Sequence, residues 1–193
     1  MRCFIAIELP KTVHDRIGRL QEQLRSQVRG VGWTRTEQIH LTLKFLGDVP
    51  DAALPKVIDA ASAVAGRFAP MDLTVAGAGC FPPHGAARVL WVGIASPPPE
   101  LTACVEACEQ AMAALGFPPE NRPYHPHLTL GRVKDFDAGR QARTAIEQVV
   151  DFDAGGFTAT ELILFQSVLQ RTGPIYTPMA HMPLGGQAFR AFS

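Results

Sequence analysis

The chain carries no excess of charge of either sign. Its 193 residues include 18 Lys and Arg and 18 Asp and Glu, so the formal net charge is zero. Proteins that coat long stretches of nucleic acid usually have a basic surplus, because phosphate contacts dominate their affinity. The balance therefore argues against a general nucleic-acid-coating protein. It leaves room for a local basic site that binds a small anion or one end of an RNA.

Long apolar runs and paired cysteine motifs are also missing. No run of 18 apolar residues occurs, so no membrane span is expected. Residues 1–8 lack the apolar stretch of a signal peptide, and a cytoplasmic location is expected. No G-x-S-x-G surrounds a serine, which argues against a serine hydrolase. The four cysteines form no C-x-x-C pair and are expected to be small buried residues: Cys3, Cys80, Cys104 and Cys108.

What the chain does contain is a large apolar fraction arranged in strand and helix patterns. Hydrophobic residues make up 47% of it and charged residues 19%, which is typical of a globular protein. Three- and four-residue apolar spacing predicts amphipathic helices, and short apolar runs between turns predict strands. Helices are expected at 11–28, 51–68 (with Asp51 as N-cap), 100–115 and 138–150. Strands are expected at 2–9, 40–46, 71–81, 88–95, 127–133, 157–169 and 175–184.

The order of these elements in the first half recurs in the second half, after the linker-like stretch 96–99. This repeat predicts an α+β protein of two pseudo-symmetric lobes, each an antiparallel sheet flanked by helices, around a central cleft. Residues 1–193 are expected to form a single domain made of these two similar lobes.

The tetrapeptide His-Leu-Thr-Leu occurs twice, at His40–Leu43 and at His127–Leu130. Each copy opens an expected strand that is followed by a charged turn and a helix, so duplicated lobes would place the copies symmetrically. Successive strand residues point to opposite faces. The histidine and threonine of each copy then share one face, and the leucines face the helices. If the lobes pair, two imidazoles and two hydroxyls converge on one polar cleft.

Two histidines and two threonines suit acid–base chemistry on a phosphodiester. In-line attack needs a base beside the entering oxygen and an acid beside the leaving oxygen, and imidazole can act as either near neutral pH. The hydroxyls of Thr42 and Thr129 can donate to the non-bridging oxygens. A lone strand histidine is more often structural, so the interpretation depends on the matched pair His40 and His127. Two histidines are too few ligands for a metal site, and neither a metal nor another cofactor is expected.

With these motifs, the sequence resembles the two-histidine (2H) phosphoesterase superfamily, which is marked by a pair of H-x-[ST]-x motifs. More narrowly, it resembles the RNA 2',3'-cyclic phosphodiesterases, originally named 2'-5' RNA ligases. The segments that carry the narrower resemblance extend along the whole chain. They are Arg2–Ile7, His40–Asp48, Arg88–Gly93, Arg122–Arg132, Ser167–Leu169 and Gly173–Tyr176.

The resemblance implies hydrolysis of RNA 2',3'-cyclic phosphate ends to 2'-phosphomonoesters by two lobes of α+β structure. It implies that His40 is the proton donor to the leaving oxygen and that His127 is the proton acceptor that activates water. Gly131 stands where the family often has Ala, and a glycine would let the backbone approach a ligand more closely. The expected partners are RNA ends or small cyclic nucleotides. No membrane and no obligatory protein partner are expected, and the chain is expected to act as a monomer.

Five further residues are candidate substrate contacts. Lys44, four residues after His40, falls on the histidine face by simple alternation and could pair with a phosphate. The same rule puts Arg132 on the face opposite His127. The resemblance favours Arg132 as a phosphate contact, although only a bulge near Gly131 would turn it inward. The candidates for stacking on a base, with core packing as the alternative, are Phe45, Tyr124 and Tyr176.

Two other functions stay open at this point. The same site could join a cyclic phosphate to a 5'-hydroxyl as a 2'-5' linkage, because microscopic reversibility permits the reverse reaction. A non-catalytic module that holds RNA ends is the other alternative, but binding alone needs no acid–base pair. The histidines His14, His84 and His181 belong to no motif and are expected to be structural or exposed.

Overall fold

The structure is a computed structural model that describes residues 1–170, 173–185 and 190–191. The α-helices are α1 (Lys11–Gln27), α2 (Leu54–Ala65), α3 (Pro99–Ala114) and α4 (Phe136–Glu147). The strands are β1 (Arg2–Glu8), β2 (Val31–Trp33), β3 (His40–Asp48), β4 (Met71–Phe81), β5 (Val89–Ala95), β6 (His127–Val133), β7 (Asp153–Ala159), β8 (Glu161–Gln170), β9 (Gly173–Pro183) and β10 (Arg190–Ala191). Two 3-10 helices, η1 (Thr36–Gln38) and η2 (Asp51–Ala53), precede β3 and α2.

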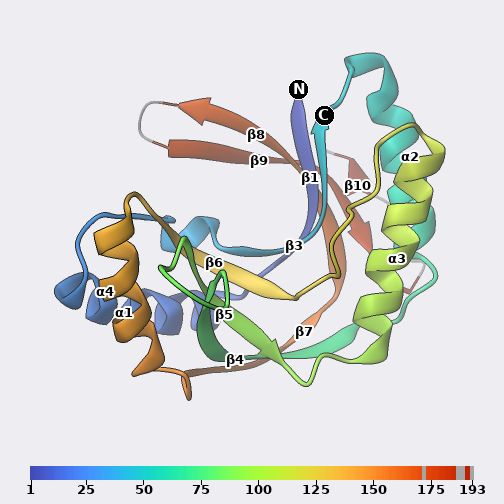
Figure 1. Cartoon of the computed structure of the whole chain (residues 1–193). Coiled ribbons are helices and arrows are strands. Elements are labelled where there is room, and N and C mark those ends of the chain that lie inside the picture. Colours follow the sequence, from blue (N-terminus) through green and yellow to red (C-terminus); the bar gives the residue numbers. More distant parts are fainter. Residues whose placement is uncertain (171–172, 186–189, 192–193) are drawn as a thin grey trace.

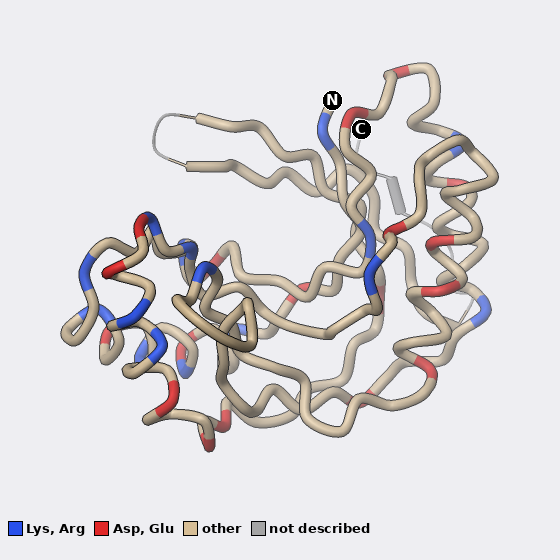
Figure 2. The backbone as a smooth tube through the Cα atoms, viewed as in Figure 1, with Lys and Arg blue, Asp and Glu red and all other residues tan. Residues whose placement is uncertain are grey.

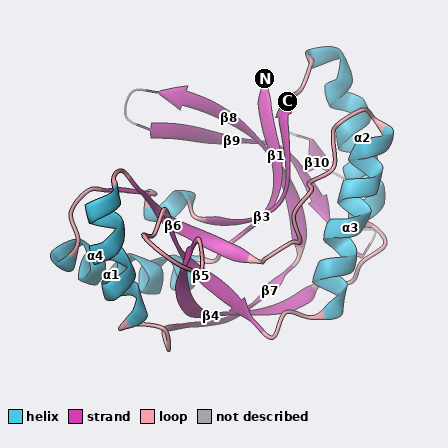
Figure 3. Ribbon diagram, in the orientation of Figure 1, coloured by secondary structure: helices cyan, strands magenta, loops and turns pink. Residues whose placement is uncertain are grey.

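The strands form two sheets, with orders β10-β9-β8-β1-β3 and β2-β6-β5-β4-β7, as Figures 1 and 3 show. All of the strand pairs are antiparallel. Helices α2 and α3 pack against the first sheet, and α1 and α4 pack against the second. The prediction of an α+β protein with two lobes, each an antiparallel sheet flanked by helices, is confirmed.

The two lobes are not the two halves of the chain, because the halves exchange strands. The hairpin of β4 and β5 comes from the first half but pairs with β6 and β7 in the second sheet. The hairpin of β8 and β9 comes from the second half but pairs with β1 in the first sheet. The orders β9-β8-β1-β3 and β7-β4-β5-β6 therefore match, and the motif strands β3 and β6 take equivalent places. These two strands lie side by side where the sheets meet (Figure 1).

Apolar residues at helical and strand spacing build a core that continues through both lobes. Helix α1 contributes Val13, Ile17, Leu20 and Leu24, at the predicted three- and four-residue spacing. A second, smaller cluster lies on the other face of the first sheet: Phe4, Ala6, Ile163 and Phe165. All four cysteines are buried and free, as predicted. No helix in the described part of the chain is both long and apolar enough to span a membrane.

Several element ends differ from the predictions. Asp51 does not cap a helix with its side chain, because a 3-10 turn after Pro50 occupies 51–53 and α2 begins at Leu54. Helix α4 begins earlier than predicted, at Phe136, because the Asp135 carboxylate accepts a hydrogen bond from Ala138 N at 2.9 Å. The apolar run predicted as one strand from 157 to 169 is divided between β7 and β8, which lie in different sheets.

Candidate active site

His40 lies at the start of β3 and is held from two sides. Its Nδ1 lies 2.8 Å from the carbonyl oxygen of Gln38, the last residue of η1. Its ring stacks on Phe4 with centroids 4.6 Å apart, and the ring of Tyr176 packs edge-on at 5.2 Å. These contacts fix the orientation of the imidazole before any substrate arrives.

His127 has the same arrangement in the second lobe. Its Nδ1 lies 2.7 Å from the carbonyl oxygen of His125, again two residues back along the chain. The ring of Phe81 packs edge-on against it at 5.1 Å. A carbonyl can only accept a hydrogen bond, so Nδ1 must carry the proton in both histidines. In both rings Nε2 is then the nitrogen that holds a lone pair when neutral and donates a proton when charged.

The environment of the His40 ring disfavours a positive charge on it. Burial lowers the pKa of His40 to about 4. The nearby charge of His14 lowers it a little further, and the hydrogen bond to the Gln38 carbonyl, which favours the charged ring, opposes both effects. The free protein therefore holds the His40 ring neutral at pH 7.

A β-bulge in β3 determines which side chains accompany His40. Ala6 of β1 is opposite Thr42, but Ile5 is opposite Lys44, so Leu43 is the extra residue. Strand alternation holds from His40 to Leu43, with both leucines of this motif buried as predicted. After the bulge the alternation of side chains is shifted by one residue, so Phe45 rather than Lys44 lies on the face of His40 and Thr42.

The prediction that Lys44 contacts the substrate is therefore wrong. Its side chain is only 1% exposed and points toward α3. The ammonium group donates to Glu109 Oε2 at 2.8 Å and to the carbonyl of Pro118 at 2.7 Å. Simple alternation failed here because the bulge shifts the strand by one residue, and Lys44 has become a buried structural cation.

A matching bulge in β6 has the opposite consequence for Arg132. Trp91 of β5 is opposite Thr129, Leu90 is opposite Gly131, and Leu130 is the extra residue. Arg132 is exposed and is opposite Val89, two residues from Trp91, so it shares the face of Thr129 and His127. The bulge that this orientation requires is present.

Gly131 serves the packing of β2, not the approach of a ligand. A Cβ at this position would lie 2.8 Å from Val31 Cγ1 and 3.1 Å from the carbonyl oxygen of Gly32. We expected this glycine to bring the backbone close to a ligand. The structure shows instead that it lets β6 pack closely against β2.

The three predicted aromatic contacts fall into different positions. Phe45 is 58% exposed and lies on the histidine face, with its ring centroid 5.9 Å from that of Phe4. Tyr176 packs against His40. The pKa of its hydroxyl is raised, because the effect of burial exceeds the opposite effect of Arg132 and Arg2. Arg132 of the second lobe therefore lies within electrostatic reach of an aromatic residue of the first.

Tyr124 takes the alternative role of a core residue. It packs against the main core, and its hydroxyl donates to the carbonyl of Thr42 at 3.0 Å. Burial raises the pKa of this phenol. Tyr124 thus ties the segment before β6 to the backbone of the first motif, and it is not available for stacking on a base.

Sequence reasoning did not identify Gln21 of α1, which links the second motif strand to the turn that precedes the first. This fully buried side chain donates from Nε2 to Leu130 O at 2.9 Å and to Thr34 O at 2.8 Å. Its Oε1 accepts from Thr36 Oγ1 at 2.7 Å. One glutamine thereby holds the β6 bulge and the η1 turn, whose last carbonyl orients His40. A polar residue on the apolar face of the predicted helix was the available signal.

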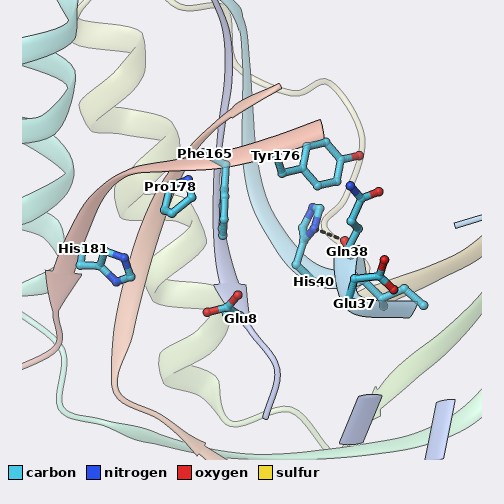
Figure 4. A pocket seen from close by; sticks show the side chains of 9 residues that line it. Glu8, Glu37, Gln38, His40, Phe165, Tyr176, Pro178 and His181 are labelled. Carbon is cyan, nitrogen blue, oxygen red and sulfur yellow. Dashed lines mark hydrogen bonds between the residues drawn. The ribbon is translucent and has the colours of Figure 1, made fainter. Parts of the chain in front are cut away.

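A hollow beside His40 is lined by side chains of β1, β8, β9 and η1 (Figure 4). Glu8 and Glu37 belong to it, and sequence reasoning did not single out either residue. Glu8 is the cross-strand neighbour of His40, a relation that only the strand pairing reveals. Within the residues that the structure describes, no three His, Cys, Asp or Glu side chains gather as a metal site would require.

The sequence profile of the family described as LigT like Phosphoesterase matches the chain twice, over residues 7–91 and 92–176. The chain belongs to the LigT-like phosphoesterases. Each match contains one H-x-T-x motif, and the boundary between them lies just before the linker-like residues 96–99. The internal repeat and the resemblance to the two-histidine phosphoesterases are thereby confirmed.

Relatives of this LigT-like phosphoesterase cover nearly all of the chain. The RNA 2',3'-cyclic phosphodiesterase of Methanocaldococcus jannaschii is 33% identical over 176 residues, which are 91% of this chain and 96% of that protein. A crystal structure from Thermus thermophilus matches with a TM-score of 0.81 at 27% identity, covering 97% of this chain and 100% of that one. E. coli LigT complexed with 3'-AMP matches with a TM-score of 0.73 at 28% identity, covering 95% and 97%.

Proposed function

We propose that this phosphoesterase hydrolyses the 2',3'-cyclic phosphate at an RNA end to a 2'-phosphomonoester, with His40 and His127 as its acid–base pair. The observation that carries the proposal is the twin geometry of the two rings. Each Nδ1 is bound to a carbonyl two residues back, at 2.8 and 2.7 Å. Each Nε2 is thereby the nitrogen left to exchange a proton with a substrate.

In this mechanism His127 Nε2 takes a proton from water while the water oxygen bonds to phosphorus. The bond from phosphorus to the 3'-oxygen breaks, and His40 Nε2–H gives its proton to that oxygen. Thr42 and Thr129 donate to the non-bridging oxygens, whose charge they stabilise. Arg132, which shares the face of His127, supports the same charge. The proton then returns from His127 to His40 through solvent before the next turnover.

The low pKa of His40 demands that the substrate itself supplies part of the activation. A proton donor must be charged, but burial keeps this ring neutral in the free protein at pH 7. A phosphodiester anion beside the ring favours the imidazolium and raises its pKa. His40 therefore takes up its proton as the substrate binds.

The same low pKa also favours a second assignment, in which neutral His40 is the base and His127 is the acid. A substrate with a better leaving group distinguishes between the two assignments of acid and base. A p-nitrophenyl phosphodiester needs little protonation of its leaving oxygen, so it restores much of the rate of a variant that lacks the acid. If the p-nitrophenyl substrate restores the rate of His40→Ala, His40 is the acid, as proposed. If it restores the rate of His127→Ala, the roles are reversed.

The decisive assay is digestion of 2',3'-cyclic nucleotides with chromatographic separation of the 2'- and 3'-monophosphates. We expect only 2'-phosphate, and losses of about 10²- to 10⁴-fold for His40→Ala and His127→Ala. Thr42→Ala and Thr129→Ala should lose about 10²-fold or less. His84→Ala, an exposed histidine outside both motifs, is the control. Full activity of either motif variant would overturn the mechanism, and 3'-phosphate alone would overturn the proposed regiochemistry.

A further inference from the structure

The hollow beside His40 is lined by flat apolar side chains and by two carboxylates. Phe165, Tyr176 and Pro178 provide the walls, and Glu8 and Glu37 lie at the side nearest η1 and the end of β1 (Figure 4). Its volume is about 130 Å³, which is smaller than a site that encloses a whole small molecule, and it is partly open to solvent.

The wall of this hollow is rigid. The ring of Phe165 stacks on Phe4 at 5.3 Å, and Phe4 in turn stacks on His40. Tyr176 meets the same Phe4 ring edge-on at 5.0 Å. Aromatic faces that are already ordered lose little conformational freedom when a planar group packs on them.

The charge of this hollow is unsuited to a phosphate. Both carboxylates are exposed, and among the described residues that line the hollow none is Lys or Arg. Besides the two carboxylates and His40, the titratable side chains that line it are Tyr176 and His181, and His181 Nδ1 lies 2.9 Å from Glu161 Oε1. Carboxylates only accept hydrogen bonds when ionised, so the group they fit carries N–H donors and no negative charge.

The second lobe lacks this carboxylate. The residue opposite His40 is Glu8, and the residue opposite His127 at the equivalent place is Gly93. The cation on the histidine face is Arg132, which belongs to the second lobe. Figure 2 shows a similar polarity on the outside, with Lys and Arg frequent around α1 and α4 and acidic residues frequent along α2 and α3. The two sides of the reacting phosphate are therefore chemically different.

We propose that this hollow is a nucleobase subsite in which Glu8 and Glu37 select bases that carry an amino group. The inference rests on the proposed function, since it seats the base of the nucleotide whose cyclic phosphate reacts at His40. Guanine fits best, because its N1–H and N2–H₂ donors match one carboxylate side by side. Uracil fits worst, because its single N–H lies between two carbonyl oxygens that the carboxylates repel.

The test compares kcat/KM for the 2',3'-cyclic phosphates of guanosine, inosine, adenosine, cytidine and uridine. Guanosine and inosine differ only in the amino group, so they form the matched pair of substrates. We expect guanosine to exceed both inosine and uridine by about tenfold or more, as for loss of a hydrogen bond to a charged acceptor. In the Glu8→Gln/Glu37→Gln double variant this preference should fall to below about threefold. Glu22→Gln, an exposed carboxylate on the outside of α1, is the control.

Equal rates for all five nucleotides would refute the subsite and leave the phosphodiesterase intact. A guanosine preference that survives in the double variant would also refute it. If no cyclic nucleotide is hydrolysed, the proposed function fails instead. Titration with the five nucleoside 2'-monophosphates, read by tyrosine and tryptophan fluorescence, then decides the subsite alone. A base preference that disappears in the double variant supports it, and a preference that is absent or unchanged overturns it.

Discussion

Acidification should destabilise this protein through His40, and the size of the effect follows from the burial of its ring. The pKa is about 4 in the folded chain, against about 6.5 in an unfolded one. Because the folded value is the lower one, the stabilisation is complete above pH 6.5 and is lost as the pH falls toward 4. The loss between pH 7 and pH 5 is about 2 kcal/mol, and it reaches roughly 3 kcal/mol at pH 4.

Urea unfolding at pH 7 and pH 5 measures this effect by comparison with His40→Gln, which cannot titrate at this position. The other titrating groups are common to both proteins, so their effects cancel when the change in unfolding free energy of the variant is subtracted from that of the wild type. The wild type should lose about 2 kcal/mol more than the variant over this interval. His84→Gln, at an exposed position, should behave as the wild type. Equal losses in wild type and His40→Gln, or an NMR midpoint for the His40 ring near 6.5, would refute the reasoning.

The same group should shape the pH dependence of catalysis. The acidic limb of kcat/KM reports the free protein and should lie near pH 4. The acidic limb of kcat reports the complex and should lie at higher pH, because the bound anion stabilises the charged ring. Coincident limbs would show that the substrate does not raise the pKa of His40.

Four further predictions follow from the site. Lys44→Met should lower the free energy of unfolding by roughly 3 kcal/mol, because it leaves Glu109 without its cation, yet it should not change KM. Arg132→Ala should lower kcat/KM by about tenfold or more without affecting urea unfolding, whereas Arg140→Ala, exposed on α4, should do neither. Gln21→Leu should cost about 1–3 kcal/mol in unfolding experiments and also lower kcat, since it releases both the β6 bulge and η1. Activity should survive exhaustive chelation, and its restoration by one added divalent metal after loss would contradict the two-histidine mechanism.

Local patterns were enough to predict the motif strands and most of the helices. Apolar spacing gave α1 to within one residue, and alternation placed His40 and Thr42 opposite Leu41 and Leu43. These features depend on neighbours in the chain, which a single sequence contains.

Features that depend on strand pairing were not predictable. Counting from a histidine put Lys44 on the histidine face and Arg132 on the opposite face, and both placements are wrong because of bulges that only the partner strands define. The resemblance, not the count, favoured Arg132 as a phosphate contact. The division of 157–169 between two strands has the same origin, because β7 pairs with β4 and β8 with β1. Glu8 is distant from His40 in the sequence and became visible only through the β1–β3 register.

The exchange of strands between the two sheets has a consequence for any attempt to divide this chain into halves. Cut near residue 96, neither half keeps a complete sheet. The first half contributes β2, β4 and β5 to the second sheet, and the second half contributes β8, β9 and β10 to the first. Separately produced halves should therefore be poorly folded alone and should recover structure, and both histidines in one site, only when mixed.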